Sequence, residues 1–186
     1  AIGLSSKARN HAIAMGMDSD VSGENAIGIG RDAKSFSEEA ISMGYMARAH
    51  AKESLALGNR AFVVGEKITD AAYNALSAAE KKNYAKDDDY GYVKINGDSY
   101  YSTAVGPQAK AYGKNATALG NANVGSIGEG RMADGGTAIG SSSNAAYENA
   151  TALGFHSIAY AKDEVTHGAN TRTKTTGEDA LRNDPQ

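Results

Sequence analysis

The phrase Ala-Ile-Gly-Ile-Gly at residues 26–30 returns as Ala-Ile-Ser-Met-Gly at 40–44 and as Ala-Thr-Ala-Leu-Gly at 116–120 and 150–154. The glycine that ends each phrase belongs to a series with a nearly fixed spacing of 14 residues. The series comprises Gly3, Gly16, Gly30, Gly44, Gly58, Gly106, Gly120, Gly140, Gly154 and Gly168. Self-similarity at a fixed period indicates stacked coils. We therefore predict an all-β single-stranded solenoid with about 14 residues per coil, and expect each glycine to supply the positive φ of a sharp corner.

Each coil contains two stretches whose residues alternate with period 2, as in β-strands. In the first stretch Ala33, Ser35 and Ser37 are small, whereas the intervening Lys34 and Phe36 are large or charged. The same alternation recurs in the following coils. We expect the small side chains to face the interior of the coil and the large ones to face outward.

The second stretch has no charged side. Ile27 and Ile29 lie on one side and Ala26 and Gly28 on the other, and such strands are buried on both faces. We expect the Ile/Leu/Met side to fill the coil and the small side to contact another chain, although the reverse assignment remains open. Either way a single coil stack would expose an apolar strip, so we expect the chain to be an obligate oligomer. The predicted interface residues are Ala26, Gly28, Ala40, Ser42, Ala56, Ala116, Ala118, Ala150 and Ala152.

Composition excludes several classes of protein. The 186 residues include 22 glycines, 7% aromatic residues and no Trp, which argues against a thick globular core. The net charge of −3 and the absence of a basic stripe argue against nucleic-acid binding. No apolar run is long enough to span a membrane. Because the chain begins within a repeat phrase, we expect any export signal or membrane anchor to lie outside it.

The rhythm is interrupted between Gly58 and Gly106, where we predict an inserted lobe at 59–105. Thr69 and Asp70 can start a short helix, and Ser77 with Glu80 forms a capping box for a second helix that reaches about Lys86. The segment 92–101, with Asn-Gly at 96–97, indicates a β-hairpin. A smaller interruption predicts a protruding loop at 128–134.

Candidate ligand-binding residues fall in two groups. Tyrosine offers large, stiff contact area with a polar tip, which favours recognition surfaces. The tyrosines of the lobe either bind a ligand or form the lobe's own core: Tyr73, Tyr84, Tyr90, Tyr92, Tyr100 and Tyr101. The second group is an outward ladder on the first strands, either a binding face or only the solvent side of the coils: Phe36, His50, Tyr112 and Tyr160, with Lys34, Arg48 and Lys110.

The sequence contains no recognisable catalytic or metal-binding motif. The four histidines show no metal-ligand spacing, and Asp87-Asp88-Asp89 lacks the calcium-loop pattern, so we interpret it as a solvated acidic corner. No cysteine is present to bind a metal. No Ser/His/Asp set or carboxylate pair stands out. We therefore expect neither enzymatic activity nor a cofactor.

The repeated phrases resemble the YadA-like head of trimeric autotransporter adhesins of Gram-negative bacteria. The resemblance is carried by the segments at 25–33, 115–123 and 149–157 and extends over residues 1–60 and 104–168. It implies a left-handed parallel β-roll and a homotrimer. The roll would occupy residues 1–58 and 106–170, followed by a tail at 171–186 toward a neck or stalk. The lobe at 59–105 and the absence of the family's neck phrase are departures from the pattern.

The resemblance also implies a function. Such heads are displayed on the bacterial surface, anchored in the outer membrane through other regions, and bind collagen, fibronectin, laminin or a cell-adhesion receptor. We therefore expect an adhesin head that mediates attachment to host cells. The alternatives are a passive spacer or autoaggregation module of a surface fibre, an ice-binding solenoid, for which the threonine array is too short, and a carbohydrate-active solenoid, for which carboxylate pairs in register are missing.

Overall fold

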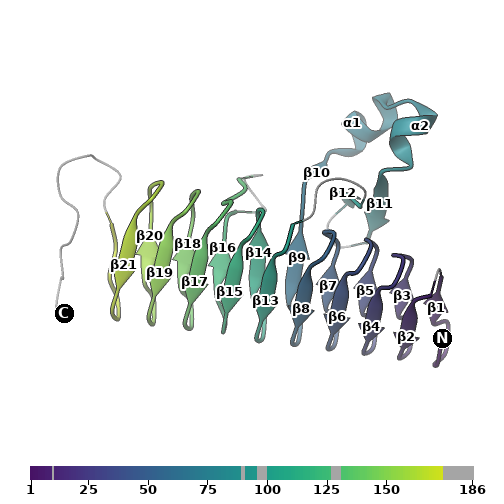
Figure 1. Ribbon diagram of the computed structural model, residues 1–186, viewed down its shortest axis with the longest axis horizontal. Helices are drawn as coiled ribbons and strands as arrows, with labels where there is room; N and C mark the ends of the chain where they lie inside the picture. The colour runs from purple at the N-terminus through teal and green to yellow at the C-terminus, as the bar shows by residue number, and fades with distance from the viewer. Residues whose placement is uncertain (10, 89–90, 96–99, 127–130, 174–186) are drawn as a thin grey trace.

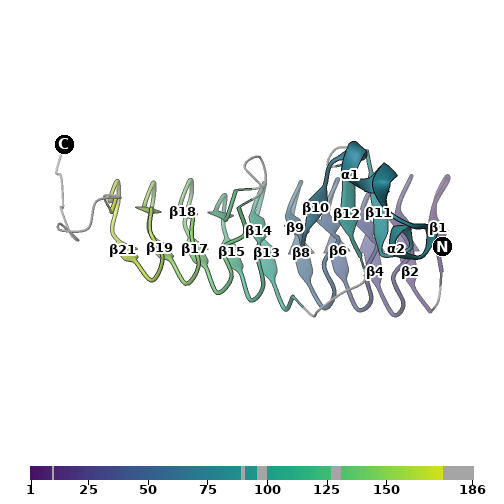
Figure 2. The ribbon, with the colours of Figure 1, turned by 90° about the horizontal axis from the view of Figure 1, so that it is seen from above.

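The computed structural model describes residues 1–9, 11–88, 91–95, 100–126 and 131–173. They form a rod of stacked coils from which a lobe projects over the N-terminal half (Figures 1 and 2). Each coil gives one strand to each of two nine-stranded parallel sheets. The all-β solenoid predicted from the 14-residue period is therefore confirmed.

We call the two sheets of the rod sheet A and sheet B. Sheet A consists of β2 (Ile13–Met15), β4 (Ile27–Ile29), β6 (Ile41–Met43), β8 (Leu55–Leu57), β13 (Thr103–Val105), β15 (Thr117–Leu119), β17 (Thr137–Ile139), β19 (Thr151–Leu153) and β21 (Val165–His167). Sheet B consists of β1 (Lys7–Ala8), β3 (Asp20–Val21), β5 (Lys34–Ser35), β7 (Arg48–Ala49), β9 (Phe62–Val64), β14 (Lys110–Tyr112), β16 (Asn123–Val124), β18 (Asn144–Ala145) and β20 (Ile158–Ala159).

Equivalent residues of successive coils pair in register. Ile27 pairs with Ile41, and Ile41 with Leu55. The same register continues across the long interruption, because Leu55 pairs with Thr103 and β9 pairs with β14. The roll is therefore continuous, and the chain leaves it after Val64 and rejoins it by Thr103, within the predicted boundaries of 59–105.

The recurring glycines sit at a corner where adjacent coils approach closely. Gly30 has a φ of +133°, and a Cβ added there would lie 2.3 Å from the carbonyl oxygen of Gly44. A side chain is excluded both by the backbone conformation and by the next coil. The expected positive φ is confirmed, and the 14-residue glycine period follows from this stacking.

The interior of the roll is lined by small side chains from both sheets. In β15 the side chain of Ala118 is fully buried, whereas its neighbours Thr117 and Leu119 are only partly covered. Where one sheet contributes a larger residue the other contributes glycine: a Cβ on Gly28 would lie 2.4 Å from Val21 Cγ2. The two sheets are thus too close together for Ile, Leu or Met to fit between them.

This arrangement shows that the prediction of which side of the second strand faces the interior was wrong. All nine residues expected at the contact with another chain are buried within the single chain: Ala26, Gly28, Ala40, Ser42, Ala56, Ala116, Ala118, Ala150 and Ala152. The Ile/Leu/Met side faces outward instead, which is the reverse assignment. The small side of the first strand does face inward as predicted, since Ala33, Ser35 and Ser37 are buried.

The lobe, residues 65–102, contains β10 (Lys67–Ile68), α1 (Asp70–Ala75), α2 (Ala78–Lys81), β11 (Tyr84–Asp87) and β12 (Gly91–Lys94). Its strands form an antiparallel sheet in the order β10-β12-β11. Thr69 caps α1, and Ser77 and Glu80 form the predicted capping box of α2. Both helix starts are confirmed, but α2 ends at Lys81, earlier than the predicted Lys86.

The predicted hairpin was wrong in its pairing. β12 pairs with the preceding strand β11 on one side, with Lys86 opposite Tyr92, and with β10 on the other. The Asn-Gly dipeptide that suggested the turn lies within 96–99, outside the described residues. Of the loop predicted at 128–134, the described part begins at Arg131, which bonds back to Ser126 through two backbone hydrogen bonds.

Candidate functional site

An apolar strip runs along the outer face of sheet A over its whole length. Each strand of this sheet contributes its first and third residues, such as Ile41 and Met43 of β6. Six of these hydrophobic side chains are classed as exposed, with exposed fractions from 37% to 56%: Ile13, Met15, Met43, Leu57, Ile139 and Val165. No Asp, Glu, Lys or Arg occupies any first or third position of the sheet A strands. We call this surface the apolar ladder.

The ladder is large and regular enough to be an interaction surface. Soluble monomers rarely expose contiguous apolar patches of this extent. Burying the remaining exposed area of one such side chain would contribute on the order of 1 kcal/mol. In the C-terminal half the first row becomes threonine, at Thr103, Thr117, Thr137 and Thr151, so the ladder is most apolar near the N-terminal end.

A second surface is covered by the lobe. Val93 of β12 packs against Phe36, Phe62, Val64 and Tyr112, which lie on the outer face of the coils around sheet B. Val93 is fully buried, and the four roll residues are at most 7% exposed. The Ser37 hydroxyl also donates to the carbonyl of Ile95, at 2.9 Å. The lobe is thus docked on the roll by a small apolar core of its own.

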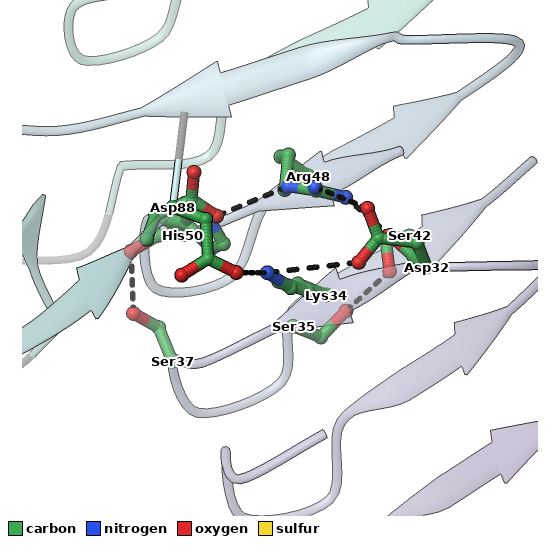
Figure 3. Close-up of polar contacts among 9 residues, drawn as sticks. Asp32, Lys34, Ser35, Ser37, Ser42, Arg48, His50 and Asp88 are labelled. Carbon is green, nitrogen blue, oxygen red and sulfur yellow. Dashed lines mark hydrogen bonds and ion pairs between the residues drawn. The ribbon is translucent and has the colours of Figure 1, made fainter. Parts of the chain in front are cut away.

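Beside this core, the end of β11 inserts a carboxylate into the roll surface. Asp87 Oδ2 lies 3.0 Å from Arg48 Nε and 3.0 Å from His50 Nε2. All three side chains are at most 2% exposed. Arg48 also donates to the carboxylate and the backbone carbonyl of Asp32, linking adjacent coils. We call Arg48, His50 and Asp87 the latch (Figure 3 shows Arg48 and His50 with the surrounding polar contacts).

His50 is held between aromatic rings. Its ring stacks on Phe36 at a centroid distance of 4.5 Å and meets the edge of Phe62 at 6.1 Å. Burial lowers the pKa of His50, and the hydrogen bond to Asp87 opposes this shift only in part. The neutral ring therefore carries its proton on Nε2, where it donates to the carboxylate. Its Nδ1 has no hydrogen-bond partner among the described residues.

A lysine at the rim completes the polar contacts. Lys34 Nζ lies 2.9 Å from Asp88 Oδ2 of the lobe and 3.6 Å from Asp32 Oδ1 (Figure 3). Burial tends to lower the pKa of Lys34, but the hydrogen bond that Lys34 donates to Asp88 and the charges of Asp87 and Asp32 outweigh it, so the pKa is raised. The lobe is therefore attached by charge-assisted bonds as well as by apolar contact.

These contacts correct several predicted ligand residues. Phe36, His50 and Tyr112 do not form an outward ladder, because the docked lobe buries them, and Lys34 and Arg48 are buried with them. Tyr100 is also buried, at 9% exposure. The interpretation of residues 87–89 as a solvated acidic corner was wrong for Asp87, which is buried and forms an ion pair. Burial of the sheet B face could not be foreseen without knowing where the lobe docks.

The remaining candidates are scattered. Tyr73, Tyr84 and Tyr92 form a half-buried cluster in which the rings of Tyr73 and Tyr92 stack at 3.5 Å. Tyr101 is 62% exposed at the base of the lobe, and Tyr160 is half-buried on the C-terminal half of the roll. Tyr90 lies outside the described residues. The structure therefore does not bring the predicted ligand residues together into one surface.

No group of three or more His, Cys, Asp or Glu side chains within the described ranges could hold a metal ion. Nor does the described part of the chain contain a helix long and apolar enough to cross a membrane.

The fold is a β-solenoid of stacked coils with an exposed apolar ladder. The model of the YadA head domain repeat (2 copies) matches three segments, at residues 37–61, 99–123 and 133–157. The resemblance is confirmed: the chain contains YadA head domain repeats, which support a YadA-like head domain of the kind found in trimeric autotransporter adhesins. Such heads are surface-exposed adhesin modules and are typically non-enzymatic. No curated protein matches the chain.

Proposed function

We propose that the chain is the head of a bacterial surface adhesin that assembles as a homotrimer and attaches the cell to a host protein. The fibre would be anchored in the outer membrane by regions outside this chain. Its partner would be a matrix protein such as collagen, fibronectin or laminin, or a cell-adhesion receptor. The YadA-like repeats support the adhesin class, and the apolar ladder supports the assembly.

The observation that carries the proposal is the outward direction of the ladder. Three copies packed around one axis would cover the ladder of each chain and leave sheet B and the lobe on the periphery. The lobe is then the part of the head that is free to meet a partner. Helices α1 and α2 have no fully buried residues, and all of their residues except Tyr73 and Lys81 are exposed in the single chain.

Assembly is tested by placing a charge in the ladder. Ile41→Glu or Leu55→Glu should convert the trimer to a monomer, because three carboxylates would be buried together near the axis. Lys110→Glu on the exposed face of sheet B is the matched control and should leave the trimer intact. Light scattering gives the mass directly. A well-folded wild-type protein of 19 kDa in dilute buffer would contradict the proposal.

Binding is tested with a panel of immobilised matrix proteins and epithelial receptors. In the lobe-deleted variant, residues 65–101 are replaced by Ala-Lys-Glu, the sequence of the equivalent corner at 51–53, since Ala49 aligns with Val63 and Leu55 with Thr103. Loss of binding assigns recognition to the lobe. Because this deletion uncovers Phe36 and Phe62, Tyr101→Ser is the companion variant that leaves the docking core untouched. A trimer that binds nothing on the panel or on host cells is a spacer.

A further inference from the structure

We propose that the groove between the corners of the first coils and the end of β11 binds a neutral saccharide. This inference rests on the proposed function and adds a ligand class to it. The groove has a volume of 490 Å³ and is lined by residues of the first four coils and by Asp88 of the lobe. A volume of this size is typical of pockets that hold small ligands.

The floor of the groove alternates in charge. Lys7, Asp20 and Lys34 occupy equivalent positions in three successive strands of sheet B. In the strand register Lys7 lies opposite Asp20, and Asp20 lies opposite Lys34. The Lys7 ammonium lies 3.9 Å from the Asp20 carboxylate. Asp88 closes the groove at the lobe through its bond to Lys34. Hydrogen-bond donors and acceptors therefore follow one another along the floor.

The corner wall supplies groups with unused hydrogen-bonding capacity. Arg31 is exposed, and its guanidinium lies over the ring of Tyr45 at 5.7 Å from the centroid. Within the described residues the structure gives no hydrogen bond or ion pair to the side chains of Arg31 and Asp18. Tyr45 is 39% exposed, so part of its ring is open to the groove. A guanidinium, a carboxylate and an aromatic ring thus line the groove without being committed to one another by hydrogen bonds.

The balance of charge decides the class of ligand. Three cationic and four acidic side chains line the groove, so it has no large excess of either sign. A polyanion such as nucleic acid or a sulfated glycan would be steered by a basic surface, which is absent here. A sugar carries no net charge, and each hydroxyl both donates and accepts a hydrogen bond. Its apolar C–H groups can contact the exposed part of the Tyr45 side chain.

A peptide fits the groove less well. Peptides commonly add to an open sheet edge or place side chains in apolar pockets. Strands β3 and β5 are paired on both sides within sheet B, and among the strands of the floor only the two-residue β1 lies at the edge of the sheet. Tyr45 and Met46 are the only hydrophobic side chains among the lining residues. The surroundings therefore favour a polyhydroxylated ligand.

The test is a glycan array probed with the full chain in its assembled form. Neutral glycans that end in a hexose or an N-acetylhexosamine should bind, with sialylated and sulfated glycans as the comparison. Arg31→Ala and Tyr45→Ala should each weaken the binding at least tenfold. Arg60→Ala is the matched control, because Arg60 is an exposed corner residue that does not line the groove. Thermal melting of each variant shows that the fold is retained, as expected for exposed side chains.

Three outcomes overturn the saccharide proposal: no glycan bound, binding unaffected by Arg31→Ala and Tyr45→Ala, or binding confined to acidic glycans and abolished by salt. The proposed adhesin function is judged separately. If no glycan binds on the array and a host protein binds equally well after enzymatic removal of its glycans, the adhesin function stands and the saccharide proposal fails. If glycans bind but the head attaches to no host protein or cell, the adhesin function fails and the saccharide site stands.

Discussion

The Asp87 carboxylate lies 3.0 Å from His50 Nε2, and neither side chain is exposed to solvent. Asp87 belongs to the lobe and His50 to the roll, so this single contact joins two parts of the chain that are separated by 37 residues. A buried carboxylate is stable only when its charge is matched by partners that are equally well placed. The latch therefore fixes where the lobe can sit on the roll.

Asp87→Ala should release the lobe. It leaves Arg48 and His50 buried without the lobe's carboxylate, and breaking a buried ion pair costs about 3–5 kcal/mol. Hydrogen exchange of the Val93 amide should become faster, while that of Ala118 in the roll is unchanged. Asp70→Ala is the control, because Asp70 is an exposed carboxylate of the lobe in α1. Equal protection of Val93 in both variants would show that the latch does not hold the lobe.

The stability of the docked lobe should depend on pH through His50. Its pKa is lower in the folded state than the ordinary value of 6.5, so the unfolded or undocked state binds more protons. Stability is complete above about pH 6.5 and falls as the pH drops from there toward the folded pKa. Local hydrogen exchange of the lobe at pH 7.5 and pH 5.5 measures the effect. His50→Gln should flatten this dependence, and an unchanged slope would assign it to another group.

The inward direction of the small residues is tested by two substitutions on neighbouring positions. Ala118→Val adds two methyl groups to a fully buried site and should destabilise the roll by about 1–3 kcal/mol. Thr117→Val changes the outward face of the same strand and should alter stability by less than about 0.5 kcal/mol. Chemical denaturation gives both values. The opposite ranking would restore the assignment in which the small side faces out.

The glycine corner makes a prediction of its own. Gly44→Ala should destabilise the roll by about 3 kcal/mol or more, because φ is +133° and the added Cβ would lie 2.3 Å from the Gly58 carbonyl oxygen. Gly91→Ala, in the lobe, has a positive φ of 76° but no atom within 4 Å of the added Cβ. Its cost should be about 1–2 kcal/mol, that of the backbone conformation alone. Thermal melts that rank the two variants equally would refute the close-approach explanation.

The sequence by itself determined what repeats and what is local. The spacing of Gly30 and Gly44 predicted the coil, because every corner must meet the next one and only glycine fits there. The N-caps of α1 and α2 could also be predicted, because the Thr69 and Ser77 side chains accept hydrogen bonds from backbone amides only three residues away. The alternation around Lys34 correctly gave the inward side of the first strand.

The tertiary structure decided the rest. Whether Ala118 or Leu119 points inward depends on the distance between two sheets, which is set by the whole stack and not by the strand's own pattern. The burial of Arg48 and His50 depends on Asp87, a residue that looks like part of an exposed acidic run in the sequence. A long-range contact of this kind produces no repeating pattern in the sequence, because it involves only one pair of residues and not every coil.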